Sequence, residues 1–400
     1  MHCPAVINTR IHHLRPYPFE RLRDLLADLK PGMDPIHVHL GEPQHPVPAV
    51  VAPCLAQHAG DWGRYPPVQG TEAFRVAIAE WLRQRYALPE LMINPGTMIL
   101  PASGTREALY MIHQVLPAPS PDVSYAVMSD PFYQVYYAGA AMGGFWPFLV
   151  PAEEGVNLFE SLASISTDIL QKTSVLTVCS PANPQGSVAT IEQWKTLIQK
   201  ARAHNIFLLA DECYSEIYTT DPPPGVLEAC RELGGSLDQV IVFNSLSKRS
   251  NVPGLRSGFI CGDPRIMAAL TRLRSYACAG MPLPIAEASV ALWSDEVHVC
   301  DNRRLYSEKF DDAAVLLKDR FAFSLPSGGF FLWLDVGDGI KATRQLWQNA
   351  GVSVLPGRFL ASCSDSDSEK SCADRFIRVA LVHTRAAMRE ALERLITVLR

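Results

Sequence analysis

The chain has 400 residues, of which 48% are hydrophobic and 19% are charged, and its formal net charge is −5. This size and composition predict a large buried core and more than one domain. No basic excess points to nucleic acid, and no apolar stretch reaches the roughly 18 residues that span a bilayer, so we expect neither a nucleic-acid nor a membrane partner. The first 20 residues lack an apolar signal core, and the ten cysteines form no Cys-x-x-Cys pair, which predicts reduced thiols in a cytoplasmic protein. The eleven histidines show no ligand spacing, so no metal site is predicted.

Short apolar runs that are typical of buried strands alternate with helical patterns between residues 98 and 262. The strands are expected at residues 98–100, 125–128, 145–150, 175–179, 206–210, 240–243 and 258–261. Helical patterns follow at residues 105–115 and 191–204. Continuous apolar strands separated by helices predict an α/β fold, with a mostly parallel, seven-stranded sheet between two layers of helices.

A mixed pattern after residue 286 predicts a second, smaller α+β domain. A long helical stretch covers residues 286–315, strands are expected at 330–334 and 375–381, and an amphipathic helix closes the chain at 385–399. We therefore divide the chain into an N-terminal segment (1–45) that packs on the small domain or on a partner, a large domain (46–290) and a small domain (291–400). The serine- and acid-rich stretch 362–371 is expected to be a surface loop without a function of its own.

Lys248 follows directly after the predicted strand 240–243 and lies among hydroxyl and guanidinium donors. Ser245 and Ser247 flank it, and Arg256 follows eight positions later. A lysine amine can condense with an aldehyde, while serine hydroxyls and an arginine can hold a phosphate dianion. An aldehyde and a phosphate on one small molecule describe pyridoxal 5′-phosphate (PLP). The alternative for an isolated lysine is a solvated position in a basic turn.

Further polar residues come directly after predicted strands, where ligands collect in parallel α/β sheets. Asp211 ends the strand 206–210, and a carboxylate there would keep the pyridine nitrogen of PLP protonated. Tyr214 and Asn183 can donate hydrogen bonds to the phenolate oxygen of the ring. The alternatives are that Asp211 caps the next turn and that Asn183-Pro184 forms an ordinary turn.

The remaining candidates would hold the phosphate, the ring and the substrate. Ser103, Gly104 and Thr105 open a helix after a strand, where backbone N–H groups suit a phosphate, although a plain helix cap explains them equally well. Tyr133 offers an aromatic face for the pyridine ring, or belongs to the core. Arg378 lies within the apolar strand 376–381, where a buried guanidinium needs an anion, either the substrate α-carboxylate or an internal salt bridge.

This constellation resembles the fold-type I PLP-dependent aminotransferases of class I and II, the aspartate aminotransferase superfamily. The resemblance extends to the segment Gly41-Glu42-Pro43, which is similar to the family's substrate loop, and to Tyr65 in the string Tyr-Pro-Pro-Val-Gln-Gly. In the family that tyrosine reaches the phosphate of the neighbouring subunit, which implies a homodimer with shared active sites. The resemblance implies amino-acid and 2-oxo-acid substrates, with Lys248 moving the α-proton and Asp211 stabilising the ring.

Several longer strings are similar to the bacterial succinyldiaminopimelate aminotransferases. They lie at residues 15–22, 40–46, 130–136, 247–259 and 281–284, whereas the segment 361–374 departs from that pattern. This narrower resemblance implies ping-pong transfer of an amino group between N-succinyl-LL-2,6-diaminopimelate and 2-oxoglutarate, within lysine biosynthesis. Both partners end in a carboxylate remote from the α-carbon, for which Arg15, Arg23 and Arg274 are candidates.

Four other functions are alternatives, and the last two are disfavoured. A different amino acid (acetylated ornithine or diaminopimelate, aspartate or an aromatic one) would use the same lysine, aspartate and arginine, as would a PLP lyase. A non-catalytic sensor domain is disfavoured because no DNA-binding segment has room before Tyr17. A nicotinamide dehydrogenase is disfavoured because no Gly-x-Gly-x-x-Gly turn follows a predicted strand.

Overall fold

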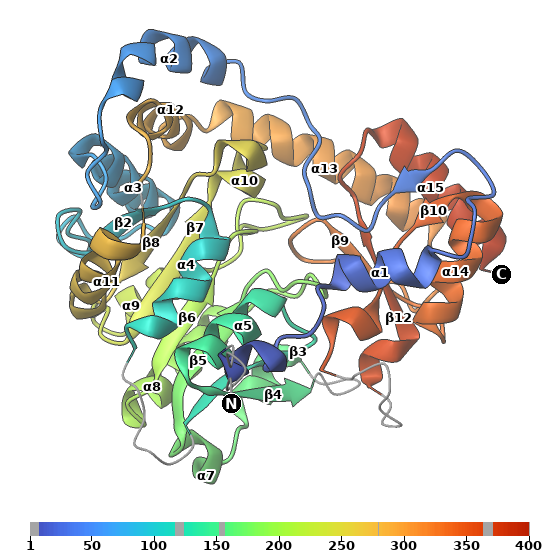
Figure 1. The fold of residues 1–400 in the computed structure, drawn as a ribbon, viewed down its shortest axis with the longest axis horizontal. Coiled ribbons are helices and arrows are strands. Elements are labelled where there is room, and N and C mark those ends of the chain that lie inside the picture. Colours follow the sequence, from blue (N-terminus) through green and yellow to red (C-terminus); the bar gives the residue numbers. More distant parts are fainter. Residues whose placement is uncertain (1–7, 117–123, 152–156, 279, 363–370, 400) are drawn as a thin grey trace, which may run out of the picture.

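The apolar runs predicted as strands between residues 98 and 262 form one seven-stranded sheet (Figure 1). The structure is a computed structural model that describes residues 8–116, 124–151, 157–278, 280–362 and 371–399. The strands lie in the order β2-β8-β7-β6-β5-β3-β4; β8 is antiparallel to both its neighbours and the other pairs are parallel. Their bounds are β2 (Ile99–Ala102), β3 (Tyr125–Asp130), β4 (Trp146–Pro151), β5 (Thr173–Cys179), β6 (Phe207–Asp211), β7 (Val240–Ser245) and β8 (Gly258–Gly262). The predicted α/β fold with a mostly parallel sheet is thereby confirmed.

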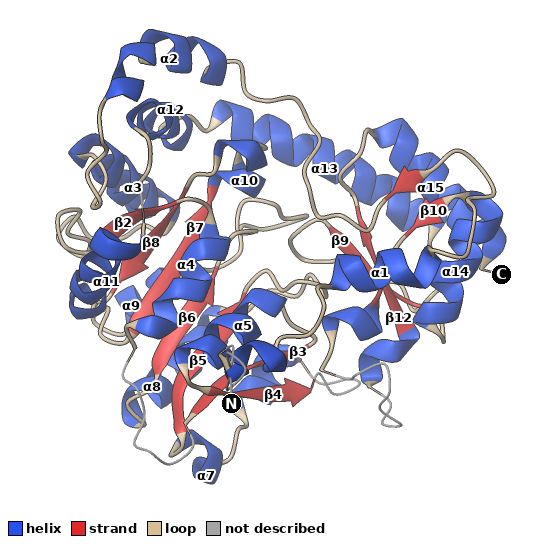
Figure 2. Ribbon diagram, in the orientation of Figure 1, coloured by secondary structure: helices blue, strands red, loops and turns tan. Residues whose placement is uncertain are grey.

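Helices cover both faces of this sheet, which explains why its strands are apolar throughout (Figure 2). In β6, Leu208 and Ala210 enter one core while Phe207 and Leu209 enter the other. The first core is closed by α3 (Glu72–Arg85), α6 (Leu158–Ala163), α8 (Ile191–Ala203), α9 (Val226–Glu232) and α12 (Leu283–Trp293). The second is closed by α4 (Thr105–Met111), α5 (Gln134–Gly143) and α11 (Pro264–Ala277).

A second unit holds a core of its own around a three-stranded antiparallel sheet, β11-β12-β9. Its elements are β9 (Phe331–Asp335), β10 (Val352–Ser353), β11 (Leu355–Pro356), β12 (Phe376–Ala380), α13 (Val297–Leu316), α14 (Gly339–Ala350) and α15 (Arg385–Val398). The short strand β1 (Ile36–His37) pairs in parallel with β10, so the amino-terminal part of the chain joins the carboxyl-terminal part. In Figure 1, α13 runs from the neighbourhood of α12 into this unit.

The carboxyl edge of the large sheet faces the second unit. Asp130, Cys179, Asp211 and Ser245 are the last residues of β3, β5, β6 and β7, and parallel strands bring them to one edge. Arg378 of β12 reaches this edge, because its side chain donates to Asn183 in the loop after β5. The functional site therefore lies where the two units meet.

The remaining elements are short. They are α1 (Pro18–Leu26), α2 (Val51–Gln57), α7 (Thr167–Leu170), α10 (Leu246–Arg249) and the 3₁₀ helices Thr9–His13, Ala59–Gly63, Ile112–Gln114, Pro253–Leu255, Gly357–Leu360 and Cys372–Arg375. Within the described ranges, no helix is both long enough and apolar enough to cross a bilayer. The division at residues 45 and 290 stays a prediction. Most of the expected loop 362–371 lies outside the described residues.

Candidate active site

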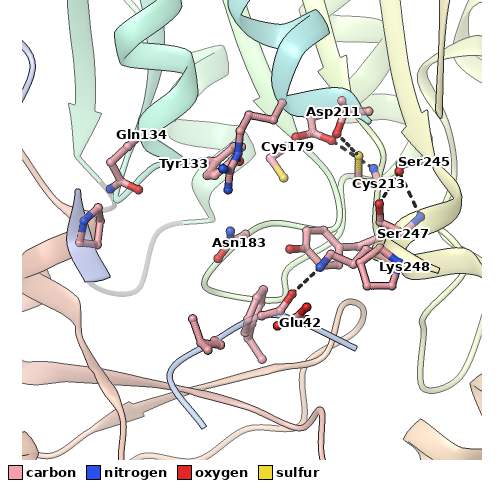
Figure 3. A pocket seen from close by; sticks show the side chains of 18 of the residues that line it. Glu42, Tyr133, Gln134, Cys179, Asn183, Asp211, Cys213, Ser245, Ser247 and Lys248 are labelled. Atoms are coloured by element: carbon pink, nitrogen blue, oxygen red, sulfur yellow. Dashed lines mark hydrogen bonds between the residues drawn. The ribbon is translucent and has the colours of Figure 1, made fainter. Parts of the chain in front are cut away.

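A cavity of about 500 Å³ opens at the carboxyl edge of the sheet (Figure 3). Residues of the large sheet, of the segment around Gly41 and of the second unit line it together. Most of the residues predicted from the sequence are brought together here, namely Gly41, Thr105, Tyr133, Asn183, Asp211, Tyr214, Ser245, Ser247, Lys248, Arg256 and Arg378. Side chains from strands and loops far apart in the sequence thus share one hollow.

Lys248 projects into the cavity from the short helix α10, which begins directly after β7. Its Nζ donates to the carbonyl oxygen of Gly41 and lies 5.2 Å from the centre of the Phe330 ring. Position 41 favours glycine, because the Cβ of any larger residue would lie only 2.9 Å from the ring of Phe331. Burial is the main cause that lowers the pKa of Lys248 to about 8. About a tenth of this amine is therefore uncharged, and nucleophilic, at pH 7, far more than for a lysine with an ordinary pKa.

Hydroxyl and guanidinium donors gather on the α10 side of the cavity. Ser245 caps α10 by accepting from the backbone N–H of Ser247 (3.1 Å). Arg256 donates to the carbonyl of Ser103 at 2.8 Å and lies against Gly104, which has φ +79°. A Cβ at Gly104 would lie 2.0 Å from the guanidinium, so only glycine allows this approach. Two hydroxyls, a guanidinium and close-lying backbone form a donor set that fits a phosphate dianion.

Asp211 is a buried carboxylate (4% exposed) at the end of β6. Its Oδ1 accepts from the backbone N–H of Cys213 at 3.2 Å, and its Oδ2 accepts from the Tyr136 hydroxyl at 2.5 Å. No lysine, arginine or histidine of the described residues forms an ion pair with it. Burial raises its pKa, opposed by these hydrogen bonds. A buried carboxylate that lines the cavity and has no cationic partner among the described residues fits the protonated ring nitrogen of PLP.

Arg378 is a buried guanidinium (4% exposed) that lines the cavity from strand β12 of the second unit. It donates to Asn183 Oδ1 and to the carbonyl of His39, both at 2.9 Å, and lies over the Phe331 ring at 4.2 Å. Its Nε has no hydrogen-bond partner, and no carboxylate of the described residues pairs with it. Burial lowers its pKa to about 10. The internal salt bridge considered from the sequence is absent among the described residues, which leaves this cation suited to a substrate carboxylate.

The two aromatic candidates, Tyr133 and Tyr214, also line the cavity. Tyr133 is the N-cap residue of α5, and its hydroxyl accepts from Nε of Arg106 at 3.0 Å. Tyr214 packs edge-on against Phe330 and Phe331, with ring centres 5.4 and 5.7 Å away. Burial raises the pKa of both tyrosines, so their phenols stay protonated and can donate.

Three predicted residues do not line the cavity. Ser103 and Gly104 lie just beyond it, where they contact Arg256. Tyr65 is fully exposed, at 100%. Its expected part in the site of a neighbouring subunit stays a prediction.

The arginines suggested for a remote carboxylate all lie elsewhere. Arg15 donates to the carbonyl of Ser362, Arg23 is solvent-exposed, and Arg274 is buried against the carbonyl of Pro101. Arg106, which the sequence reasoning missed, lines the cavity instead. It directly follows the string Ser-Gly-Thr, and this position at the start of a helix on the sheet edge was a usable signal.

Other lining residues were also missed. Tyr136 comes three residues after Tyr133, so both lie on the same side of α5, a spacing that pointed to the site. Tyr17 belongs to the amino-terminal segment, and only packing against the large unit brings it to the cavity. Glu42, in the segment that resembles the family's substrate loop, lines the cavity as well. The thiol of Cys213 lies 3.0 Å from the Thr105 hydroxyl, and burial raises its pKa, so it stays protonated.

The fold and this donor set place the protein among the PLP-dependent enzymes of fold type I. Comparison with known proteins agrees. The family described as "Aminotransferase class I and II" matches residues 36–395. A crystallised aminotransferase from Neisseria meningitidis Z2491 has a TM-score of 0.92 and 37% identity, covering 98% of this chain and 100% of its own.

Two curated relatives show the breadth of the group. "LL-diaminopimelate aminotransferase 2" of Trichormus variabilis is 28% identical over 96% of this chain and 97% of its own length. A protein of Streptomyces rimosus, "4-dedimethylamino-4-oxo-anhydrotetracycline transaminase OxyQ", is 30% identical over 90% of this chain and 92% of its own length. The chain belongs to the aminotransferase class I and II family. Its members depend on PLP and act on small amino and oxo acids.

Proposed function

We propose that the protein moves an amino group between N-succinyl-LL-2,6-diaminopimelate and 2-oxoglutarate, in alternating half-reactions. The observation that carries this proposal is the presence of two guanidinium groups, Arg378 and Arg106, in one cavity. Neither forms an ion pair with a carboxylate of the described residues. Two guanidinium groups without a carboxylate partner suit a substrate with an acidic group at each end. Glutamate has one carboxylate at each end, and the succinylated substrate has a second α-carboxylate and the succinyl carboxylate at its remote end.

When bound, PLP supplies an electron sink for the negative charge that develops at the substrate α-carbon. Lys248 would take the α-proton as a neutral amine and deliver it to the carbon on the far side of the substrate nitrogen, two bonds away, which its lowered pKa favours. Asp211 balances positive charge at the ring nitrogen. Ser245, Ser247 and Arg256, with the backbone at Gly104, hold the phosphate, while Tyr133 covers the ring and Tyr214 and Asn183 donate to its oxygen.

The α-carboxylate binds to Arg378, which Asn183 and the carbonyl of His39 hold in place. The remote carboxylate binds to Arg106, whose Nε is 3.0 Å from the Tyr133 hydroxyl and whose Nη2 is 3.4 Å from the Tyr17 hydroxyl. Arg106 is exposed at the mouth of the cavity, so a long acylated chain reaches it without being enclosed. Glutamate places its shorter side chain in the same direction.

A second candidate substrate is unacylated LL-diaminopimelate, after which several relatives are named. Its remote end carries an ammonium group beside the carboxylate. Glu42 lines the same cavity and is the acidic side chain that would pair with that ammonium. Acylation removes the positive charge of this ammonium group. An acidic side chain at the mouth of the cavity would therefore favour the unacylated substrate, whereas a cationic one would favour the succinylated substrate.

We further propose that two copies of the chain form a dimer in which Tyr65 completes the neighbouring site. Tyr65 is fully exposed, and Trp62 and Tyr276 are exposed at 55% and 90%. Gly280, just after α11, lies close to Pro66, so these aromatic residues belong to one region of the surface. Large exposed aromatic side chains in one region are typical of an interface.

Half-reaction spectroscopy tests the substrate assignment. The purified holoenzyme is mixed with one amino acid at a time, and the loss of the visible band of the lysine-bound cofactor is followed. N-succinyl-LL-2,6-diaminopimelate and glutamate should convert the cofactor quickly, LL-diaminopimelate slowly and leucine hardly at all. Faster conversion by LL-diaminopimelate would establish the second candidate, and equal rates with leucine would overturn both.

A further inference from the structure

Lys309 of α13 is a lysine buried in the second unit, with only 2% of its surface exposed. Its Nζ donates to the carbonyls of Leu381 (2.5 Å) and His383 (3.1 Å) and lies 2.7 Å from Nε2 of His45. It also lies 4.4 Å from the centre of the Tyr306 ring. Three acceptors match the three N–H groups of the charged amine, although burial lowers the pKa of Lys309 to about 7. A buried lysine without a carboxylate partner among the described residues is uncommon and asks for an explanation.

His45 continues the hydrogen bonds in one direction. Burial, more than the nearby Lys309, lowers the pKa of His45 to about 4, so the imidazole is neutral at pH 7. Its Nε2 accepts from Lys309, and therefore its single N–H is on Nδ1. Nδ1 lies 2.6 Å from Oδ1 of Asn302, so it donates to that oxygen.

Asn302 connects this series of hydrogen bonds to α10, the helix that bears Lys248. With its oxygen facing His45, its Nδ2 donates to the carbonyls of Lys248 (3.1 Å) and Arg249 (3.2 Å). These are the last carbonyls of α10, which has four residues and cannot satisfy them internally. Asn251, in the loop after α10, donates in turn to the carbonyl of His45.

The two ends of this series of hydrogen bonds lie near the two reactive parts of the candidate active site, the strand that bears Arg378 and the helix that bears Lys248. Leu381 directly follows β12, three residues after Arg378, and Lys248 lies on α10. Lys309 and Asn302 belong to α13 in the second unit, whereas His45 belongs to the amino-terminal segment. Hydrogen bonds therefore connect the backbone after the carboxylate-binding strand with the backbone of the lysine helix.

We propose that Lys309, His45 and Asn302 form a positioning relay that holds the lysine helix α10 in register with the strand bearing Arg378. The proposal deepens the proposed function, since it rests on Lys248 and Arg378 acting as assigned above. Each of these side chains donates a hydrogen bond to the next. If one of them is replaced, the remaining side chains lose a partner and can rotate, and the last carbonyls of α10 then lose their hydrogen bonds from Asn302. The result is a displaced Lys248 amine rather than a lost reactive group, and displacements near 1 Å cost up to about 100-fold in rate.

The test uses holoenzyme with Lys309→Met, Asn302→Ala and both together. Each single variant should keep the cofactor and a wild-type melting temperature within a few degrees, but lose about tenfold in kcat. Each should also shift the pH at which the visible band of the lysine-bound cofactor changes, because that pH reports the surroundings of the Lys248 nitrogen. Lys341→Met, at an exposed lysine of α14, is the matched control and should change neither quantity.

The double variant decides between a relay and two separate structural effects. In a relay, the second substitution removes nothing further, so the double variant should resemble each single one. Multiplied losses in kcat, or single variants with unchanged kcat and unchanged spectral pH, would overturn the relay. If Lys309→Met does not fold, Asn302→Ala decides alone through its spectral pH. A failure of the proposed function is seen separately, because Lys248→Ala would then keep the visible band.

Discussion

The Tyr136 hydroxyl donates to Oδ2 of Asp211 over 2.5 Å and so ties helix α5 to the end of strand β6. Burial, more than the neighbouring Asp211, holds the pKa of Tyr136 well above its usual range, so the phenol stays protonated and remains a donor. The backbone N–H of Cys213 donates to the other carboxylate oxygen. Both bonds stabilise the ionised form of Asp211 against the burial that raises its pKa.

Tyr136→Phe should lower kcat about tenfold to a hundredfold, since a hydrogen bond to a charged group contributes about 1.5–3 kcal/mol. The loss arises because Asp211 becomes easier to protonate and then balances the ring nitrogen less well. Steady-state kinetics and cofactor titration check it. The neighbouring Tyr137→Phe is the control, because Tyr137 stacks on Phe132 and should lose little. Equal activity of the two variants would remove the role of Tyr136.

Lys248→Ala should abolish the visible band of the lysine-bound cofactor and reduce transamination by at least about 1000-fold. The amine is both the point of attachment and the proton carrier, and among the residues that the structure describes no other lysine lines the cavity. Absorption spectra and single-turnover rates measure the two effects. Retention of both band and turnover would show that another group carries the chemistry. Lys341→Ala, on the surface, should behave like the unmodified protein.

The lowered pKa of Lys248 predicts how the cofactor-free protein reacts with PLP at different pH values. The neutral amine is the nucleophile, so its fraction grows as pH rises and levels off above about 8. An unperturbed lysine would keep gaining until about pH 10.4. Stopped-flow measurement of band formation between pH 6 and about 10.5 separates these outcomes. A rate that still climbs above pH 9 would mean that Lys248 is not desolvated.

Arg378→Met should reduce kcat/KM about 100-fold or more for every amino-acid substrate, mostly through KM, because each presents an α-carboxylate. Arg378→Lys should rescue little, since a single ammonium does not reproduce the two parallel bonds of a guanidinium. Arg375→Met is the control, three residues earlier in the sequence and just before β12, where the arginine is exposed and its ion pair with Asp335 contributes little. An effect limited to dicarboxylic substrates would exchange the roles of Arg378 and Arg106.

Arg106→Met should act selectively. We expect kcat/KM for glutamate and the succinylated substrate to fall about 30-fold to 100-fold, and the slow rate with leucine to stay within about twofold. The reason is that only the remote carboxylate meets Arg106 at the mouth of the cavity. Competition assays with paired substrates measure the ratio directly. A uniform loss for all three substrates would show a structural role through Tyr17 and Tyr133 instead.

Much of the fold and of the site was predictable because both depend on local patterns with strict geometric consequences. Apolar runs separated by helices favour a mostly parallel sheet, and residues that follow its parallel strands meet at one edge. Asp211 and Lys248 were therefore found from their positions after strands. Arg378 was found because an arginine within an apolar strand needs an anion to be stable there.

The packing of the two units against each other decided the rest. Arg106 rather than Arg15, Arg23 or Arg274 lines the same cavity as Arg378, and Lys309 contacts His45, which is 264 positions away in the sequence. Such contacts depend on how the helices and loops pack against the sheet, and the periodicity of the sequence does not predict them. Residue order specified which side chains end the strands, whereas only the folded chain selected the partners that orient them.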